Sequence, residues 1–201
     1  MKETDSFLTI EGPALGVYKD KGSKFNAYVF PIQNEESFKN QLHLIKSQES
    51  NARHHCWAFI LGEQGELSKS NDDGEPGNTA GAPILRALLK AKTTHVGCVV
   101  ARYFGGTKLG VPGLISAYGG SAEEAMKNAS ITKKIIRNKL ELSFDYGHIS
   151  FVERVINFHD IQVIKREQKD NVKYHLLVRR SKLDKVIEHV QENHHIAIRT
   201  H

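Results

Sequence analysis

The sequence predicts an α+β protein made of two domains. Its 201 residues exceed the commonest size of a single domain, and 39% hydrophobic with 25% charged residues is the composition of a chain that folds around a core. Both alternating and helical hydrophobic periods occur along the chain. The order of elements changes near Ile136, so we expect one domain over residues 1–136 and a second over residues 137–201.

The first domain is expected to begin with a small sheet and then to repeat a strand, loop and helix. Short apolar or alternating runs between Gly and Pro predict strands, and apolar residues at helical spacing predict helices. Proline is acceptable in the first turn of a helix, because its missing N–H is not needed there. The expected elements are strands Phe7–Ile10, Leu15–Lys19 and Lys24–Phe30, helix Glu35–Glu49, strand His55–Leu61, a polar loop through Gly77, a helix from Pro83, strand Val96–Ala101 and helix Pro112–Ala129.

The second domain is expected to follow the order βαββαβ. Leu183, Val186, Ile187 and Val190 have the spacing of one face of a helix, and Asp170-Asn171 is suited to a hairpin turn. This order is the ferredoxin-like plan. The expected elements are strand Arg137–Phe144, helix Gly147–Asn157, strands Ile161–Gln168 and Val172–Arg179, helix Lys182–Glu192 and strand Ile196–Arg199.

Composition limits the cellular compartments and the kinds of partner that we expect for this protein. The longest apolar runs are far shorter than the roughly 20 residues that cross a bilayer, and Met1–Asp5 leads into polar residues, so we expect a cytoplasmic protein without membrane contact. Cys56 and Cys98 lie in predicted strands, which suits reduced core thiols. The net charge of +5 divides into 16 basic and 14 acidic residues up to Ile136, and 12 and 9 beyond it. The second domain is therefore the more basic one.

A first glycine-rich segment runs from Asn71 to Pro83, just before a predicted helix. Its carboxylates, Asp72, Asp73 and Glu75, are suited to a hard metal cation, and Thr79 could cap the helix and leave backbone donors for an anion. Asp, Gly and Pro are also the residues of an ordinary surface turn. Both interpretations remain open from the sequence.

A second glycine-rich segment, Val99–Gly113, indicates a phosphate site. Its glycines allow close backbone approach, its basic residues supply positive charge, its aromatic residues offer stacking faces, and a helix N-terminus follows. Neither Gly-Lys nor GxGxxG occurs there, so it is not a Walker or Rossmann loop. Alternatively, the glycines only allow tight packing. The candidate anion-binding or nucleic-acid-binding residues are Arg102, Tyr103, Gly105, Gly106, Thr107, Lys108, Gly110 and, from the first segment, Thr79.

Two other groups of residues can be considered for binding, a basic cluster and a run of adjacent His and Cys residues. A basic cluster in the second domain could contact a phosphate backbone, or it could be a solvated face; it comprises Lys165, Arg166, Lys169, Lys173, Arg179, Arg180 and Lys182. His54, His55 and Cys56 are adjacent, so on a strand their side chains alternate between faces and cannot share one metal.

The two glycine-rich segments, together with KGSKF (Lys21–Phe25) and HHCWAF (His54–Phe59), closely resemble the bacterial YigZ-type branch of the IMPACT family. The resemblance implies a first domain like domain 2 of ribosomal protein S5 and a ferredoxin-like second domain like those of elongation factor G. It also implies that eukaryotic members control the kinase that senses uncharged tRNA, through an additional N-terminal domain that this sequence does not show. Of the functions that the resemblance implies, we expect only a link to translation or RNA to apply to this chain.

The sequence departs from the family pattern at two places. Relatives usually have SGTAG where this chain has Gly77–Gly81, and they have an arginine where it has Ser116. The loss of that charge would leave more of any anion binding to Arg102 and Lys108.

These observations favour a nucleic-acid-binding or ribosome-associated accessory protein linked to translation regulation. The alternatives are an enzyme acting on a nucleotide or other phosphorylated small molecule, for which no nucleophile–base pair is evident, and a protein-binding regulator. We expect RNA, the ribosome or a phosphate-bearing ligand as the partner, and no cofactor. If Arg102 and Lys108 only bind an anion, their replacement by alanine should leave thermal stability nearly unchanged.

Overall fold

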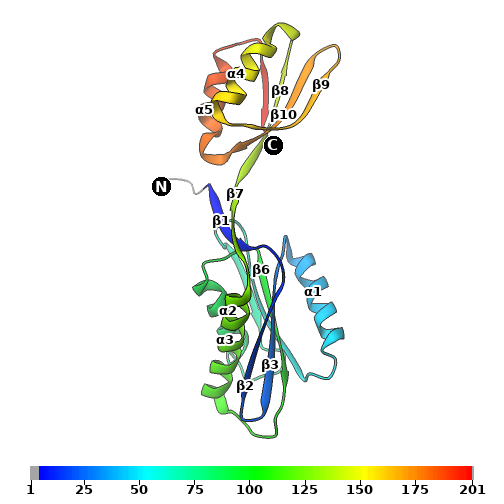
Figure 1. Ribbon diagram of the computed structural model, residues 1–201, viewed down its shortest axis with the longest axis vertical. Helices are drawn as coiled ribbons and strands as arrows, with labels where there is room; N and C mark the ends of the chain where they lie inside the picture. Colours follow the sequence, from blue (N-terminus) through cyan, green and yellow to red (C-terminus); the bar gives the residue numbers. More distant parts are fainter. Residues whose placement is uncertain (1–4, 201) are drawn as a thin grey trace. The chain divides into compact units, whose positions relative to one another are not determined.

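The computed structural model describes residues 5–200, so residues 1–4 and 201 of the two expected domains lie outside the described residues. The chain divides into two compact units (Figure 1). One is Phe7–Lys134, and the other contains Ile135 to Thr200 together with Asp5 and Ser6. Within residues 5–200, no helix is long and apolar enough to cross a bilayer. The α+β prediction is confirmed.

The first unit is built on a five-stranded antiparallel sheet in the order β2-β3-β6-β4-β5. The central strand β6 alternates its buried side chains between two separate cores, which explains its continuous apolar sequence. The strands are β2 (Ala14–Asp20), β3 (Ser23–Pro31), β4 (His54–Leu61), β5 (Leu67–Asn71) and β6 (Val96–Tyr103).

Helices cover both faces of this sheet (Figure 1). On one face, α2 (Gly81–Lys90) and α3 (Gly110–Asn128) form the larger core with the strands. On the other, α1 (Glu35–Gln48) packs Phe38 and Ile45 against the sheet. Asn34 caps α1 by accepting a hydrogen bond from Ser37 N at 2.8 Å.

Two strands were not expected from the sequence. The polar loop predicted through Gly77 is wrong in part, because β5 lies within it. This edge strand is exposed throughout and has no buried face, so no alternation marks it. The second is β7 (Ile131–Ile135), which pairs with β1 (Ser6–Ile10) in a separate two-stranded sheet. Its partner lies at the far end of the sequence, beyond the reach of local patterns.

The second unit contains the six predicted elements in the expected order. Its antiparallel sheet has the order β11-β8-β10-β9, and α4 and α5 cover one face (Figure 1). In β8 and β10, alternate apolar residues point into this core, which leaves their neighbours on the uncovered face. The elements are β8 (Arg137–Phe144), α4 (Ile149–His159), β9 (Gln162–Gln168), β10 (Val172–Arg179), α5 (Leu183–Gln191) and β11 (Ala197–Thr200).

Candidate functional site

The loop between β6 and α3 is fixed against the turn between β2 and β3. Gly105 N donates a hydrogen bond to Ser23 Oγ at 3.1 Å. A Cβ on Gly105 would lie 1.9 Å from the carbonyl carbon of Gly22, so only glycine allows this approach. The KGSKF motif therefore supports the glycine-rich loop. Thr107 and Lys108 remain exposed in that loop, and Gly106 and Gly110 have φ angles of 87° and 72°, which favour glycine.

Asp72 organises the other glycine-rich segment from within. Its Oδ1 accepts hydrogen bonds from Ala80 N at 3.0 Å and Gly81 N at 2.8 Å, and its Oδ2 accepts one from Asn78 N at 2.8 Å. Burial tends to raise the pKa of Asp72, but these backbone donors outweigh it and lower the pKa below the ordinary value. Asp72 thus satisfies the N-terminus of α2.

Thr79 does not have the capping role that the sequence suggested. The residue before α2 is Ala80, and no side chain at that position caps the helix. Thr79 is buried, and its hydroxyl donates to the carbonyl of Pro76 at 2.6 Å. Thr79 therefore stabilises the turn that begins at Pro76. Asp72 is the residue that accepts hydrogen bonds from the backbone N–H groups at the start of α2.

The departure from the family pattern at Asn78 has a structural explanation. Asn78 has a φ of 63°, in the left-handed region that favours glycine and that asparagine tolerates better than most residues. Gly81 is required for a different reason, because its Cβ would lie 2.7 Å from the backbone nitrogen of Asn71. Asparagine is therefore compatible with the backbone conformation of the segment at this position.

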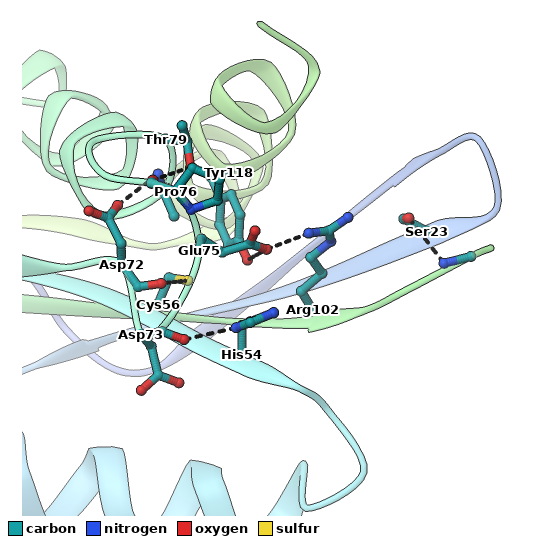
Figure 2. Close-up of polar contacts among 12 residues, drawn as sticks. Ser23, His54, Cys56, Asp72, Asp73, Glu75, Pro76, Thr79, Arg102 and Tyr118 are labelled. Carbon is teal, nitrogen blue, oxygen red and sulfur yellow. Dashed lines mark hydrogen bonds and ion pairs between the residues drawn. The ribbon is translucent and has the colours of Figure 1, made fainter. Parts of the chain in front are cut away.

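A buried ion pair joins the two glycine-rich segments (Figure 2). Arg102 Nη1 lies 2.5 Å from Glu75 Oε1, and the two side chains are 9% and 5% exposed. The Tyr118 hydroxyl donates to the same oxygen at 2.8 Å. The guanidinium carbon of Arg102 also lies 5.6 Å from the ring centre of Phe25 and 5.7 Å from that of Phe104.

A cavity of about 500 Å³ opens at this ion pair. Its polar lining is Arg53, His54, Glu75, Arg102 and Lys108, and its apolar lining includes Phe104, Leu109, Val111 and Leu114. The cavity therefore brings together both glycine-rich segments, the start of β4 and the first turns of α3. Ser116 is exposed on α3 and is not among the described residues that line the cavity.

The positive charges of this cavity differ in their surroundings. Arg102 is held by Glu75, whereas Arg53 and Lys108 are exposed, and their side chains have no ion pair within the described part of the chain. Sequence reasoning did not single out Arg53, which precedes β4 in an unremarkable polar stretch. The pairing of β4 with β6 brings Arg53 close, and Arg53 N donates to Arg102 O at 3.2 Å.

Tyr103 faces away from the cavity. Its hydroxyl donates to Glu49 Oε2 on the α1 side of the sheet, so Phe104 rather than Tyr103 offers an aromatic face to the cavity. Glu49 also accepts from the Tyr28 hydroxyl, and from Asn26 Nδ2 at 2.8 Å. Burial tends to raise the pKa of Glu49, but these donors lower it below its usual value. No sequence pattern indicates this role for Glu49, which reads only as a charged residue at the end of a helix.

The three carboxylates suggested for a metal do not converge. Asp72 binds backbone donors and Glu75 binds Arg102, while Asp73 Oδ2 accepts from His55 N at 2.7 Å. Among the residues that the structure describes, no group of three or more His, Cys, Asp or Glu side chains is arranged to hold a metal. The geometry thus gives the metal hypothesis no support.

The adjacent histidines and Cys56 have separate roles. His54 Nδ1 donates to the carbonyl of Asp73 at 2.8 Å (Figure 2), and His54 lines the cavity. His55 Nε2 bonds instead to Glu49 O on the other face, at 3.1 Å. The Cys56 thiol donates to Asp72 O at 3.0 Å, and burial raises its pKa to about 12, so it is not a reactive thiolate.

The basic cluster of the second unit is divided between two faces of its sheet. Arg166 contacts Glu153 at 3.1 Å and lies over the Tyr174 ring on the helix side. Lys165 lies on the uncovered face, where its Nζ is 2.7 Å from Glu167. Arg179 ends β10, and Arg180 begins the short turn that follows. The basic cluster expected from the sequence therefore does not form one surface.

Comparison with known proteins gives consistent relationships. The model of the Impact N-terminal domain matches residues 21–126. "IMPACT family member YvyE" of Bacillus subtilis is 33% identical over 78% of this chain and 72% of its own length. "IMPACT family member YigZ" of Escherichia coli is 29% identical over 81% of both. A crystal structure of a hypothetical protein is 25% identical, covers 97% of both chains and has a TM-score of 0.70.

The family match includes both glycine-rich segments, the KGSKF turn that supports the second of them, and the strand that carries His54. The sequence resemblance is thus confirmed by a match over more than half of the chain. This chain belongs to the IMPACT family, in the branch that includes the bacterial YigZ.

Proposed function

We propose that this protein is an RNA-binding accessory factor linked to translation, and that the cavity of the first unit binds a phosphate-bearing ligand. The observation that carries the proposal is the pair of exposed, unpaired cations, Arg53 and Lys108, at one cavity. Buried ion pairs are already satisfied, whereas free exposed cations are available to phosphate. Membership of the IMPACT family supports the link to translation. We also propose a cytoplasmic location, because translation takes place there.

The proposed fold assignments are compatible with this role. We assign the first unit to the class of ribosomal protein S5 domain 2 and the second to the ferredoxin-like class. The strand order β11-β8-β10-β9 with both helices on one face supports the second assignment. Such a sheet leaves one face free, and here that face carries Lys139 and Lys173, which add a second surface for phosphate.

The test is binding of the purified protein to total RNA and to ribosomes across a salt series. We expect binding that weakens steeply with salt, and a smaller slope in the double variant Arg53→Ala/Lys108→Ala. Loss of two phosphate contacts on single-stranded RNA should reduce the slope of log K against log salt by about 1.4.

The matched control is Arg86→Ala/Lys39→Ala, which removes two exposed cations that do not line the cavity. It should keep the wild-type slope, since a change in net charge alone does not remove local contacts. The proposal fails if the protein does not bind RNA or ribosomes at low salt. It also fails if the two double variants behave alike.

A further inference from the structure

We infer that the cavity of the first unit binds one unstacked nucleotide, with the base against Phe104 and the phosphate against Arg53 and Lys108. This inference rests on the proposed function and specifies what the cavity recognises. The nucleotide belongs either to single-stranded RNA or to a free mononucleotide. The two sources share the same chemistry, and the experiment below separates them.

The apolar lining points to more than a phosphate. Phe104 is 48% exposed and Val111 is 52% exposed, and they lie at one cavity with Leu109 and Leu114. A bare anion is strongly hydrated and gains nothing from these side chains. A base has an apolar π-face, and stacking on an aromatic side chain is how proteins hold unpaired bases.

The size of the cavity agrees with such a ligand. Its volume of about 500 Å³ lies within the range of about 300–1,000 Å³ that is typical of small-molecule sites. A phosphate group alone would leave most of this space empty. A nucleotide, which has a base and a sugar beside its phosphate, would fill more of it.

The ion pair adds polar groups beside the apolar wall. Glu75 Oε1 accepts from Arg102 and Tyr118, while its Oε2 accepts none among the described residues. A base edge carries N–H donors, which can bond to this free carboxylate oxygen.

The backbone around the cavity is already in place. Ser23 and Gly22 hold the glycine-rich loop from one side, and Asp72 holds the other segment. Phe104 is also close to Arg102, with its ring centre 5.7 Å from the guanidinium carbon. The main chain on both sides of the cavity is therefore held in place by contacts within the protein.

The experiment measures binding of a labelled single-stranded RNA of about ten nucleotides, of the same sequence as a duplex, and of the four nucleoside monophosphates with inorganic phosphate as the reference. We expect the single strand to bind more tightly than the duplex. We also expect each nucleotide that binds to exceed inorganic phosphate, because phosphate lacks the base.

Variants of Phe104 measure how much stacking of a base on its ring contributes to binding. Phe104→Ala should weaken binding by at least about fivefold, while Phe104→Trp should retain it. The matched control is Phe158→Ala, which removes a phenylalanine that is 77% exposed in the second unit and should not change binding. Thermal unfolding of each variant identifies folded protein, and Phe104→Trp keeps the test valid if Phe104→Ala is unstable.

The outcomes for this inference and for the proposed function are distinct. Salt-sensitive RNA binding that depends on Arg53 and Lys108 but not on Phe104 overturns the nucleotide site and leaves the RNA role intact. Mononucleotide binding that depends on Phe104, without RNA binding, supports the site with a free nucleotide and overturns the RNA role. Equal affinity for inorganic phosphate and nucleotides overturns the inference, as does the absence of any binding.

Discussion

Glu75 and Arg102 form an ion pair beneath the candidate site, although each belongs to a different glycine-rich segment. The positions lie 27 residues apart in the sequence, and neither side chain is more than 9% exposed. The relationship assigns Arg102 two roles. It contributes to the floor of the cavity, and it holds the segment that carries Glu75 against β6.

The first prediction concerns this ion pair. Arg102→Ala should lower the free energy of unfolding by about 3–5 kcal/mol, because it leaves Glu75 buried without its partner. The double variant Arg102→Ala/Glu75→Ala should lose less than the sum of the two single losses. Urea unfolding of all three proteins and the wild type gives the coupling energy.

Lys108→Ala is the control for that prediction, since Lys108 is exposed and unpaired in the described chain. Its unfolding free energy should stay within about 0.5 kcal/mol of the wild type. The neutral stability expected from sequence for both cations therefore applies only to Lys108. A similarly small change in Arg102→Ala would contradict the importance of the pair.

The second prediction concerns Asp72 and pH. Asp72→Asn should cost about 1 kcal/mol at neutral pH, because the amide cannot accept all three backbone hydrogen bonds. The native pKa of Asp72 is lowered, so its contribution is complete above the unfolded pKa of about 3.9 and is lost as pH falls through the native pKa. The difference from wild type should therefore narrow below about pH 4.

Urea unfolding from neutral to acidic pH measures this difference. The control is Asp20→Asn in the same unit, at the end of β2, where the aspartate side chain makes no hydrogen bond to the described residues. Its stability curve should follow that of the wild type at each pH. A constant gap between Asp72→Asn and wild type down to acidic pH would show that the carboxylate charge is not what stabilises α2.

Much of the fold could be predicted from the sequence because its core elements have strong local patterns. The continuous apolar run of β6 and the alternating pattern of β10 reflect burial on two faces and on one face, respectively. By contrast, β5 has no buried residue, so its pairing with β4 leaves no periodic signal. Elements without a buried face are specified by their neighbours rather than by their own sequence.

The candidate site was found in part for the same reason. Unusual glycines mark the loop around Gly105, because close approach restricts the residue type there. Neither Glu49 nor Arg53 has an unusual residue type for its position in the sequence. Their positions near the site depend on tertiary contacts. Glu49 reaches Tyr103 across 54 residues of sequence, and the alternation of β6 then decides that Arg102 and Tyr103 face opposite sides.

The third prediction concerns the support of the glycine-rich loop. Gly105→Ala should destabilise the protein by about 1–3 kcal/mol, because the added methyl overlaps the backbone of Gly22 and Ser23. The loop should also become more susceptible to limited proteolysis. Gly77→Ala is the control, since nothing lies within 4 Å of a Cβ at that position. Equal stability of the two variants would show that the loop is not fixed by this contact.

The fourth prediction concerns the network behind the cavity. Tyr103→Phe should cost about 1–3 kcal/mol, because Glu49 Oε2 loses its hydroxyl donor in a buried position. Without that donor the native pKa of Glu49 rises, so the acid loss of stability should begin at a higher pH than in the wild type. Acid unfolding monitored by circular dichroism measures both effects.

Tyr18→Phe is the control for the network, because the Tyr18 hydroxyl makes no hydrogen bond to the described residues while its ring packs in the same unit. It should leave the acid midpoint unchanged. If Tyr103→Phe and Tyr18→Phe unfold at the same pH, the hydroxyl of Tyr103 does not determine the acid response of Glu49.

The fifth prediction separates the two units in RNA binding. Lys139 and Lys173 are exposed on the uncovered face of the second sheet, without ion pairs in the described chain. If this face contacts phosphate, Lys139→Ala/Lys173→Ala should reduce the salt slope of RNA binding by about 1.4, as two contacts require. Arg154→Ala/Lys185→Ala removes two exposed cations from α4 and α5 on the covered face, and it should preserve the slope. Unchanged slopes in both variants would restrict RNA contact to the first unit, because only contacts with phosphate release counterions.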